Sequence, residues 1–94
     1  MNEEKLYIII DKETKEILDY SFEEITTEDF DILEINVKKL GEYYSKHGVI
    51  TIWQNLEDER ELIITAPHDW DECVWFEYDK TAKEVVKELE EEGY

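Results

Sequence analysis

The stretch VITIWQNLEDERELIITAPHDWDECVWFEYD, residues 49–79, decides the fold class because it contains three candidate strands in succession. Residues 49–55 and 61–66 are apolar and rich in β-branched side chains, and the acidic segment between them suits a hairpin turn. Pro67 ends the second strand, since proline cannot donate a ladder hydrogen bond. Residues 72–79 alternate in polarity, as a half-buried strand does. The stretch therefore predicts an antiparallel sheet.

Toward the N-terminus, residues 6–10 and 16–22 predict a further hairpin around a polar turn. The segment 26–48 then predicts a helix, because Thr26 is a suitable N-cap and Gly48 a suitable stop. Five apolar side chains in this segment follow at helical spacing, namely Phe30, Leu33, Val37, Leu40 and Tyr44. Residues 31–37 also alternate as a strand would, which leaves open a helix that begins only near Asn36.

Toward the C-terminus, Thr81 predicts the N-cap of a last helix, in which Val85 and Leu89 belong to an apolar stripe. The order of elements is thus ββαβββα. We expect one acidic domain, residues 1–94, of the α+β class. Its antiparallel sheet has about five strands, and two helices cover one face.

The sheet is expected to bury one aliphatic face beneath the helices. That face comprises Leu6, Ile8, Ile10, Ile50, Ile52, Leu62, Ile64, Val74, Phe76 and Tyr78. The opposite face comprises Tyr7, Ile9, Thr51, Trp53, Asn55, Glu61, Ile63, Thr65, Trp75 and Glu77. An uncovered aromatic face of this kind would bind a foreign partner or a second copy of the chain. The aromatic face would not be exposed if another segment covered it, or if the register assumed for one strand were wrong by one residue.

Charge is the strongest functional signal. The chain has 27 acidic and 10 basic residues, a formal net charge of −17, where a small soluble domain carries a magnitude of about 2–8. This excess indicates either a host whose proteins are generally acidic or a surface selected to meet a strongly basic one. Direct contact with DNA, RNA or an anionic membrane is not expected, because these select Lys and Arg.

Composition excludes several other classes. A hydrophobic content of 41% excludes a disordered acidic tail, and the single cysteine, Cys73, excludes an internal disulfide framework. The sequence shows no membrane-spanning apolar run and no leader segment, so we expect a cytoplasmic protein.

Motifs for catalysis are weak. The most ligand-like stretch is 68–73, which holds His68, Asp69, Asp71, Glu72 and Cys73 but no spaced Cys/His pair. Phosphate loops, serine elbows and paired-cysteine motifs do not occur. We expect no enzyme, no cofactor and no metal, with a cysteine nucleophile or a metal site at 68–73 as the alternative.

The candidate partner-binding residues are acids with regular spacing and aromatic anchors. In an extended segment Glu57, Glu59 and Glu61 would point the same way about 6.8 Å apart, which is on the scale of successive phosphates of a nucleic acid. Alternatively, these glutamates lie at a solvated hairpin tip and sheet edge, where their charge prevents aggregation. The full set comprises Glu57, Asp58, Glu59, Glu61, Asp69, Asp71, Glu72, Glu77, Asp79, Trp53, Trp75 and Tyr7.

In size, charge and aromatic content the chain resembles the DNA-mimic inhibitors of phages and other mobile elements, which are anti-restriction and anti-CRISPR proteins. It also resembles the small acidic immunity proteins and antitoxins that cap nuclease toxins. Either resemblance implies a basic, nucleic-acid-binding effector or nuclease as the partner, inhibited by steric and electrostatic occlusion. A structural subunit that buries the aromatic sheet face, in a homodimer or a larger assembly, is a further alternative.

Overall fold

The computed structural model describes residues 3–94, which form six strands and one helix. The elements are β1 (Glu3–Ile10), β2 (Ile17–Ser21), β3 (Asp31–Ser45), β4 (Gly48–Asn55), β5 (Glu61–Thr65), β6 (Val74–Tyr78) and α1 (Ala82–Glu91). All six strands lie in one sheet of order β2-β1-β3-β4-β5-β6, and every neighbouring pair is antiparallel. The strands expected on either side of residues 26–48 are confirmed, whereas the expected strand count and the second helix are not.

The helix predicted over residues 26–48 is wrong, because most of this segment is β3. Of the expected helical stripe, Val37 is buried, whereas its other members are 39–73% exposed: Phe30, Leu33, Leu40 and Tyr44. The alternation of residues 31–37 was the correct signal. Strand β3 lies between β1 and β4. It supplies the backbone hydrogen bonds that each of these two strands requires along one edge.

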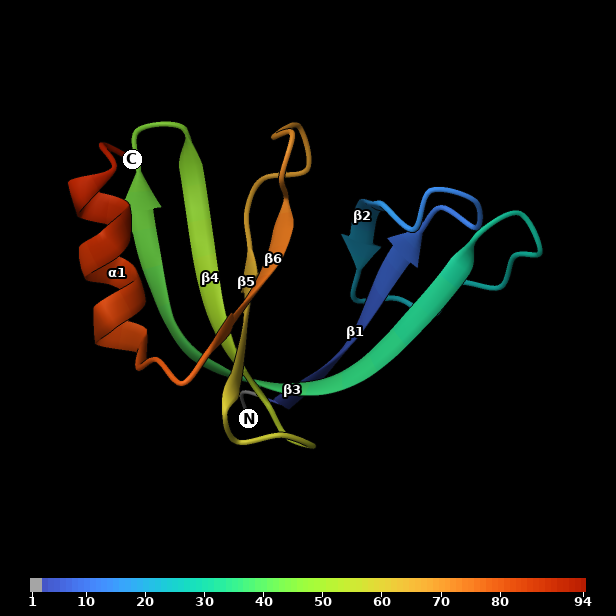
Figure 1. Ribbon diagram of the computed structural model, residues 1–94, viewed down its shortest axis with the longest axis horizontal. Coiled ribbons are helices and arrows are strands. Elements are labelled where there is room, and N and C mark those ends of the chain that lie inside the picture. Colours follow the sequence, from blue (N-terminus) through green and yellow to red (C-terminus); the bar gives the residue numbers. More distant parts are fainter. Residues whose placement is uncertain (1–2) are drawn as a thin grey trace.

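A bulge in β3 allows this one strand to serve both halves of the sheet. Lys39 lies opposite Trp53 and Gly41 opposite Ile52, so Leu40 is left without a partner residue. An extra residue of this kind bends and twists a strand. Figure 1 shows the result: β3 sweeps along the base of a half-barrel, and the edge strands β2 and β6 approach each other across the inside of the curl.

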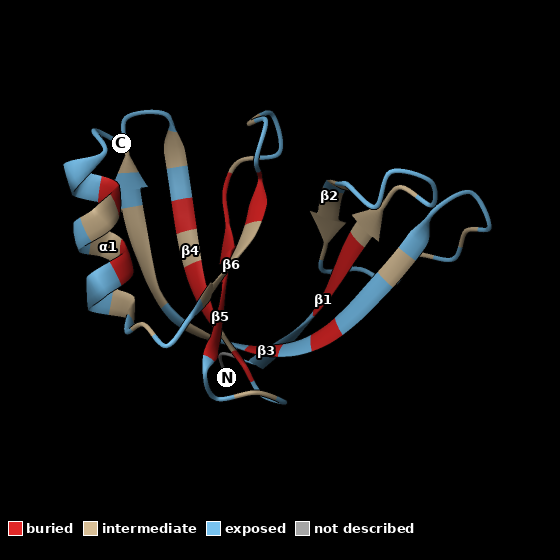
Figure 2. Ribbon diagram, viewed as in Figure 1, coloured by how far each residue is buried: buried red, intermediate tan, exposed pale blue. Residues whose placement is uncertain are grey.

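The curled sheet has a hydrophobic cluster on each face. The inner cluster comprises Leu6, Ile8, Ile35, Val37, Trp53, Ile63, Cys73 and Val74. The outer cluster lies under α1 and comprises Ile50, Ile52, Leu62, Ile64, Ala66, Val85 and Leu89. Strand β5 contributes to both clusters and is buried along its whole length (Figure 2).

The predicted division of the sheet into a core face and an uncovered face is therefore wrong. It placed the apolar residues of β1 and β6 together with those of β4 and β5, but Leu6 and Val74 belong to the inner cluster and Ile50 and Leu62 to the outer one. The error is one of register between strands, since a shift of one residue exchanges the two faces. Both faces are covered in the centre of the sheet, one by the curl and one by α1.

The C-terminal helix is confirmed. Thr81 accepts a hydrogen bond from the Glu84 backbone at 3.2 Å, and the Glu84 carboxylate accepts one from the Thr81 backbone at 3.4 Å, which is a capping box. The helix buries Val85 and Leu89 against the sheet. Within residues 3–94, no helix combines the length and the apolar character needed to cross a bilayer.

Candidate functional site

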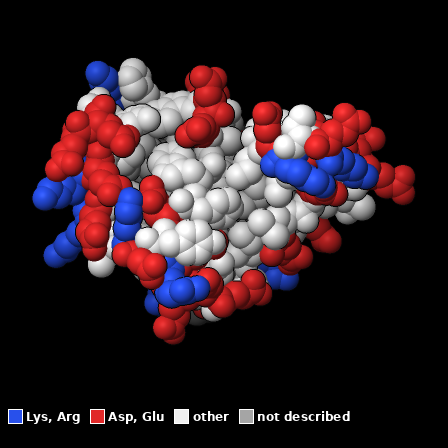
Figure 3. Space-filling model, viewed as in Figure 1, with Lys and Arg blue, Asp and Glu red and all other residues white. Residues whose placement is uncertain are grey.

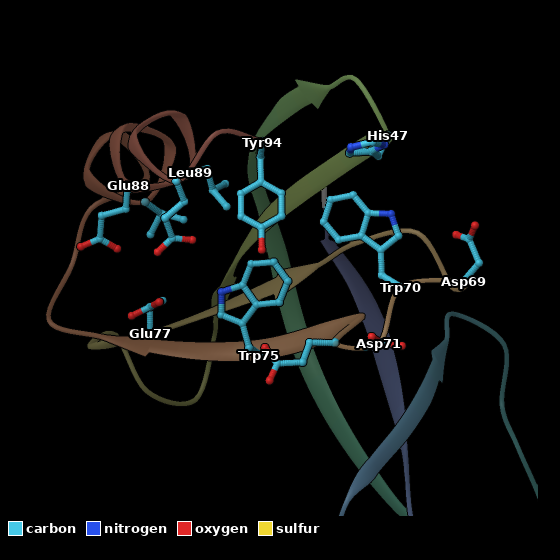
Figure 4. A pocket seen from close by; sticks show the side chains of 12 residues that line it. His47, Asp69, Trp70, Asp71, Trp75, Glu77, Glu88, Leu89 and Tyr94 are labelled. Atoms are coloured by element: carbon cyan, nitrogen blue, oxygen red, sulfur yellow. The ribbon is translucent and has the colours of Figure 1, made fainter.

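A groove of about 930 Å³ opens between α1, β6 and the segment 67–73 that joins β5 to β6 (Figure 4). Its aromatic side chains are Trp70, Trp75 and Tyr94, and His47 from the β3–β4 turn also lines it. Its carboxylates are Asp69, Asp71, Glu72, Glu77, Glu88 and Glu92. Among the residues that the structure describes, no lysine or arginine lines this groove.

Three of these rings, those of His47, Trp70 and Tyr94, come from separate segments of the chain and contact one another. Trp70 stacks on Tyr94 with ring centroids 5.4 Å apart and planes at 22°, and His47 meets the edge of Trp70 at 6.3 Å. Tyr94 is held at the backbone, since its N–H donates to Leu89 at 3.1 Å and its carbonyl accepts from the Tyr43 hydroxyl at 2.6 Å. The groove therefore has an ordered aromatic wall.

The carboxylates of the groove differ in their pairing with cations. Beside β6 and α1, the Lys80 ammonium lies 2.9 Å from Glu77 and 2.9 Å from Glu88. The hydrogen bonds that the Lys80 ammonium donates to Glu88 and Glu77 raise the pKa of Lys80, which stays charged and balances one of these two carboxylates. No ion pair within residues 3–94 involves the other carboxylates of the groove, which are Asp69, Asp71 and Glu72 on the segment 67–73 and Glu92 at the C-cap of α1.

The segment that carries Trp70 is anchored to β2, at the other edge of the sheet. The Tyr20 hydroxyl donates to the Ala66 carbonyl at 2.7 Å, and the Tyr20 ring stacks on His68 at 4.2 Å. His68 Nδ1 also lies 2.5 Å from Asp19 Oδ1. These contacts connect the edge strand β2 to the segment between β5 and β6 and fix one wall of the groove from outside it.

Cys73, at the end of this segment, is a buried neutral thiol. It is 4% exposed, and its sulfur lies 3.9 Å from Asp19 Oδ1. Burial, and next the charge of Asp19, raise the pKa of Cys73, whereas a nucleophilic cysteine requires a lowered one. Within residues 3–94, no group of three or more His, Cys, Asp or Glu side chains is arranged to hold a metal ion.

The structure brings together one part of the predicted partner-binding set. Five of its members line the groove, namely Asp69, Asp71, Glu72, Glu77 and Trp75. The other members lie elsewhere: Glu57, Asp58 and Glu59 in the β4–β5 turn, Glu61 on β5, Asp79 after β6, Trp53 on β4 and Tyr7 on β1.

The predicted row of Glu57, Glu59 and Glu61 does not form. Residues 56–60 turn instead of extending, and Gln54 Nε2 lies 3.0–3.3 Å from four carbonyl oxygens of residues 55, 58, 59 and 61. Glu61 is 9% exposed, accepts a hydrogen bond from Asn55 at 3.3 Å and is also bonded by the Tyr78 hydroxyl. It contributes to the interior of the domain, so the comparison with successive phosphates does not apply to these three residues.

Two of the predicted aromatic anchors are also internal. Trp53 is 7% exposed within the curl and donates from its indole nitrogen to Thr65 at 2.9 Å. Tyr7 is equally inaccessible, with 9% exposure. Trp75 is the one member of the trio that reaches the groove.

The other residues of the aromatic wall were not predicted from the sequence. Trp70 lies within the ligand-like stretch 68–73 and is large, apolar and flanked by acids, which is a signal for an exposed binding residue. Tyr94 and His47 gave no local signal, because only the packing of α1 and the β3–β4 turn brings them to Trp70.

Acidic side chains surround an uncharged centre on the face drawn in Figure 3, and a band of them follows α1. Comparison with known proteins finds no family model, no curated protein and no solved structure that matches the chain. The function is therefore argued from the groove and the charge of the domain.

Proposed function

We propose that this chain is a small acidic binding protein that occludes the nucleic-acid-binding surface of a basic partner protein. The observation that carries the proposal is the groove, in which six carboxylates surround three aromatic rings. A net charge of −17 accelerates encounter with a basic surface and orients it, because long-range attraction acts before contact. Half-buried aromatic rings then supply the contact energy that holds a complex together.

The mode of action in this proposal is that of the nucleic-acid-mimic inhibitors, such as phage anti-CRISPR and anti-restriction proteins. The partner uses lysines and arginines to bind phosphates, and the carboxylates of this chain occupy the same cations. Such a partner acts in the cytoplasm of the host cell, where this chain would meet it. Burial of Trp53 and Ile63, two members of the expected aromatic face, favours this proposal over an assembly subunit that buries that face.

Affinity capture with two variants of equal charge tests this proposal. In Asp69→Asn/Asp71→Asn/Glu72→Gln, three groove carboxylates are neutralised, and in the control Glu13→Gln/Glu16→Gln/Glu23→Gln, three exposed acids outside the groove lining are neutralised. We expect the wild type and the control to capture a basic protein from host extract at low salt, and the groove variant to capture much less of it.

The nucleic-acid binding of the captured protein then tests the mechanism. We expect it to bind duplex DNA or RNA, and we expect this chain and the nucleic acid to displace each other in a competition assay. Binding that is unaffected by nucleic acid, or that both triple variants retain equally, contradicts occlusion through the groove. Capture of nothing but a second copy of the chain contradicts the proposal as well.

A further inference from the structure

We infer that the groove binds an arginine side chain of the basic partner, with the guanidinium held against Trp70, Trp75 and Tyr94. This inference rests on the proposed function and names the chemical group that the groove selects. It follows from three features: two carboxylates that already share a cation, three carboxylates that have none in the described part of the chain, and an accessible aromatic wall.

Lys80 lies beside the groove and shows how two of its carboxylates bind a cation. Its ammonium bridges Glu77 on β6 and Glu88 on α1, with 2.9 Å to each carboxylate. These two carboxylates therefore already share one cation. The segment 67–73 contributes Asp69, Asp71 and Glu72 to the same groove, and none of these three has a cationic partner within residues 3–94.

The aromatic wall distinguishes this site from a simple acidic surface. Trp70 and Trp75 are half-buried and Tyr94 is 40% exposed, so all three rings can be reached from the groove. A cation over the face of such a ring is attracted by the negative electrostatic potential of the π-system. Trp70 and Tyr94 are already stacked with nearly parallel planes, which leaves little conformational freedom to be lost on binding.

Arginine fits this combination better than lysine. Its guanidinium is planar and weakly hydrated, so it stacks on an indole at a lower desolvation cost than an ammonium. Its N–H groups point outward in the plane of the guanidinium. There they can donate two parallel hydrogen bonds to a carboxylate beside the aromatic ring. Basic proteins that bind nucleic acids present arginines for the same reason, and the groove would engage such a residue in place of a phosphate or a base.

Titration with two peptides of equal charge tests the inference. Nona-arginine and nona-lysine are each added to the full chain at 150 mM and 500 mM NaCl, and binding is followed by the fluorescence of the tryptophans. We expect nona-arginine to bind roughly three- to tenfold more tightly, as a cation–π contact predicts. We also expect this ratio to persist at 500 mM NaCl, because screening weakens charge attraction more than aromatic stacking.

Two variants assign the preference to the groove. Trp70→Leu should reduce the arginine-to-lysine ratio to about one while nona-lysine still binds, whereas Phe30→Ala, which removes an exposed aromatic ring outside the groove lining, should leave the ratio unchanged. Circular dichroism of each variant establishes that it is folded. Should Trp70→Leu be unfolded, Trp70→Phe replaces it, with an intermediate ratio expected.

An equal affinity for the two peptides, or a ratio that Trp70→Leu does not change, overturns the arginine site. Neither result affects the competition between this chain and nucleic acid for a captured partner, so the two proposals can fail separately. A preference for nona-arginine combined with failure of that competition would leave the arginine site standing and overturn the proposed occlusion.

Discussion

At the scale of single residues, Gly48 shows how closely the β3–β4 hairpin approaches the groove-forming segment. Its backbone has a φ of +139°, and a Cβ at this position would lie 2.4 Å from Cγ of Pro67. We expect Gly48→Ala to destabilise the fold by about 1–3 kcal/mol, through overpacking and backbone strain. Urea unfolding measures this loss.

Gly41→Ala is the matched control for Gly48. A Cβ at residue 41 meets no atom within 4 Å, and its φ lies outside the left-handed region. We expect this variant to stay within about 0.5 kcal/mol of the wild type, as ordinary surface substitutions do. Equal losses in the two variants would show that the contact with Pro67 is unimportant.

The half-buried Tyr20 and the buried Cys73 predict that the stability of the protein declines at alkaline pH. Burial raises the pKa of Tyr20 above its ordinary 10.0 and that of Cys73 above its ordinary 9.0, so both groups bind their protons more tightly in the folded state. Their contribution is complete below the ordinary values and is lost as pH rises through the folded ones. We therefore expect the urea midpoint to decline from about pH 9 upward.

Cys73→Ala separates the thiol from the other groups that titrate in this range. Hydrogen bonds to Glu42 and Glu61 also raise the pKa of Tyr44 and of Tyr78, so these groups act in the same direction. We expect the variant to be less stable at pH 7 but to lose less stability between pH 8 and pH 10. An unchanged alkaline slope would mean that the thiol titrates normally in the folded protein.

At the scale of elements, the capping box of α1 contributes to the groove as well as to the helix. The helix has ten residues, too few for independent stability, and it carries Glu88 and Leu89 of the groove lining. We expect Thr81→Ala to cost about 1 kcal/mol, because the backbone N–H of Glu84 loses its acceptor, the Thr81 hydroxyl. Thermal unfolding measures this cost, and Lys83→Ala, at an exposed site in the first turn, should change the midpoint little.

Elements with local signals were predictable from the sequence, and those decided by distant contacts were not. The capping Thr81, the turn around Asp11 and the alternation of Val74 to Tyr78 located α1, the first hairpin and β6 correctly. Asp11 also closes its turn by accepting from Glu13 and Thr14 at 2.8 and 2.9 Å.

Residues 31–37 alternated as a strand does within a segment that also had helical spacing, so the local pattern could not decide between the two. The segment is a strand because it pairs with β1 along one edge and with β4 along the other. This pairing is a property of the whole sheet and not of the segment. The same limit applied to the groove. Its carboxylates at 69, 71, 72 and 77 were in the predicted set, but Trp70, Tyr94 and His47 meet only because three distant elements converge.

At the scale of the whole molecule, the excess of acids sets the balance between repulsion and pairing. The domain has a radius of gyration of 13.3 Å, and the Debye length is about 10 Å at 0.1 M salt, so added salt screens most charge pairs across it. The cationic partners of the observed ion pairs are mostly exposed, and exposed pairs contribute only about 0–1 kcal/mol each. Repulsion among 17 unbalanced negative charges opposes folding, and we expect it to outweigh these pairs.

Salt should therefore stabilise this protein. We expect the thermal midpoint to rise between 10 mM and 500 mM NaCl, because screening weakens the repulsion more than it weakens the exposed pairs. Glu13→Gln/Glu16→Gln/Glu23→Gln, which lowers the net charge from −17 to −14 (three acids fewer), should have a smaller rise. A midpoint that falls with salt would show that the ion pairs dominate. The domain would then have no excess repulsion for a basic partner to relieve, and the link between its charge and its proposed binding role would be lost.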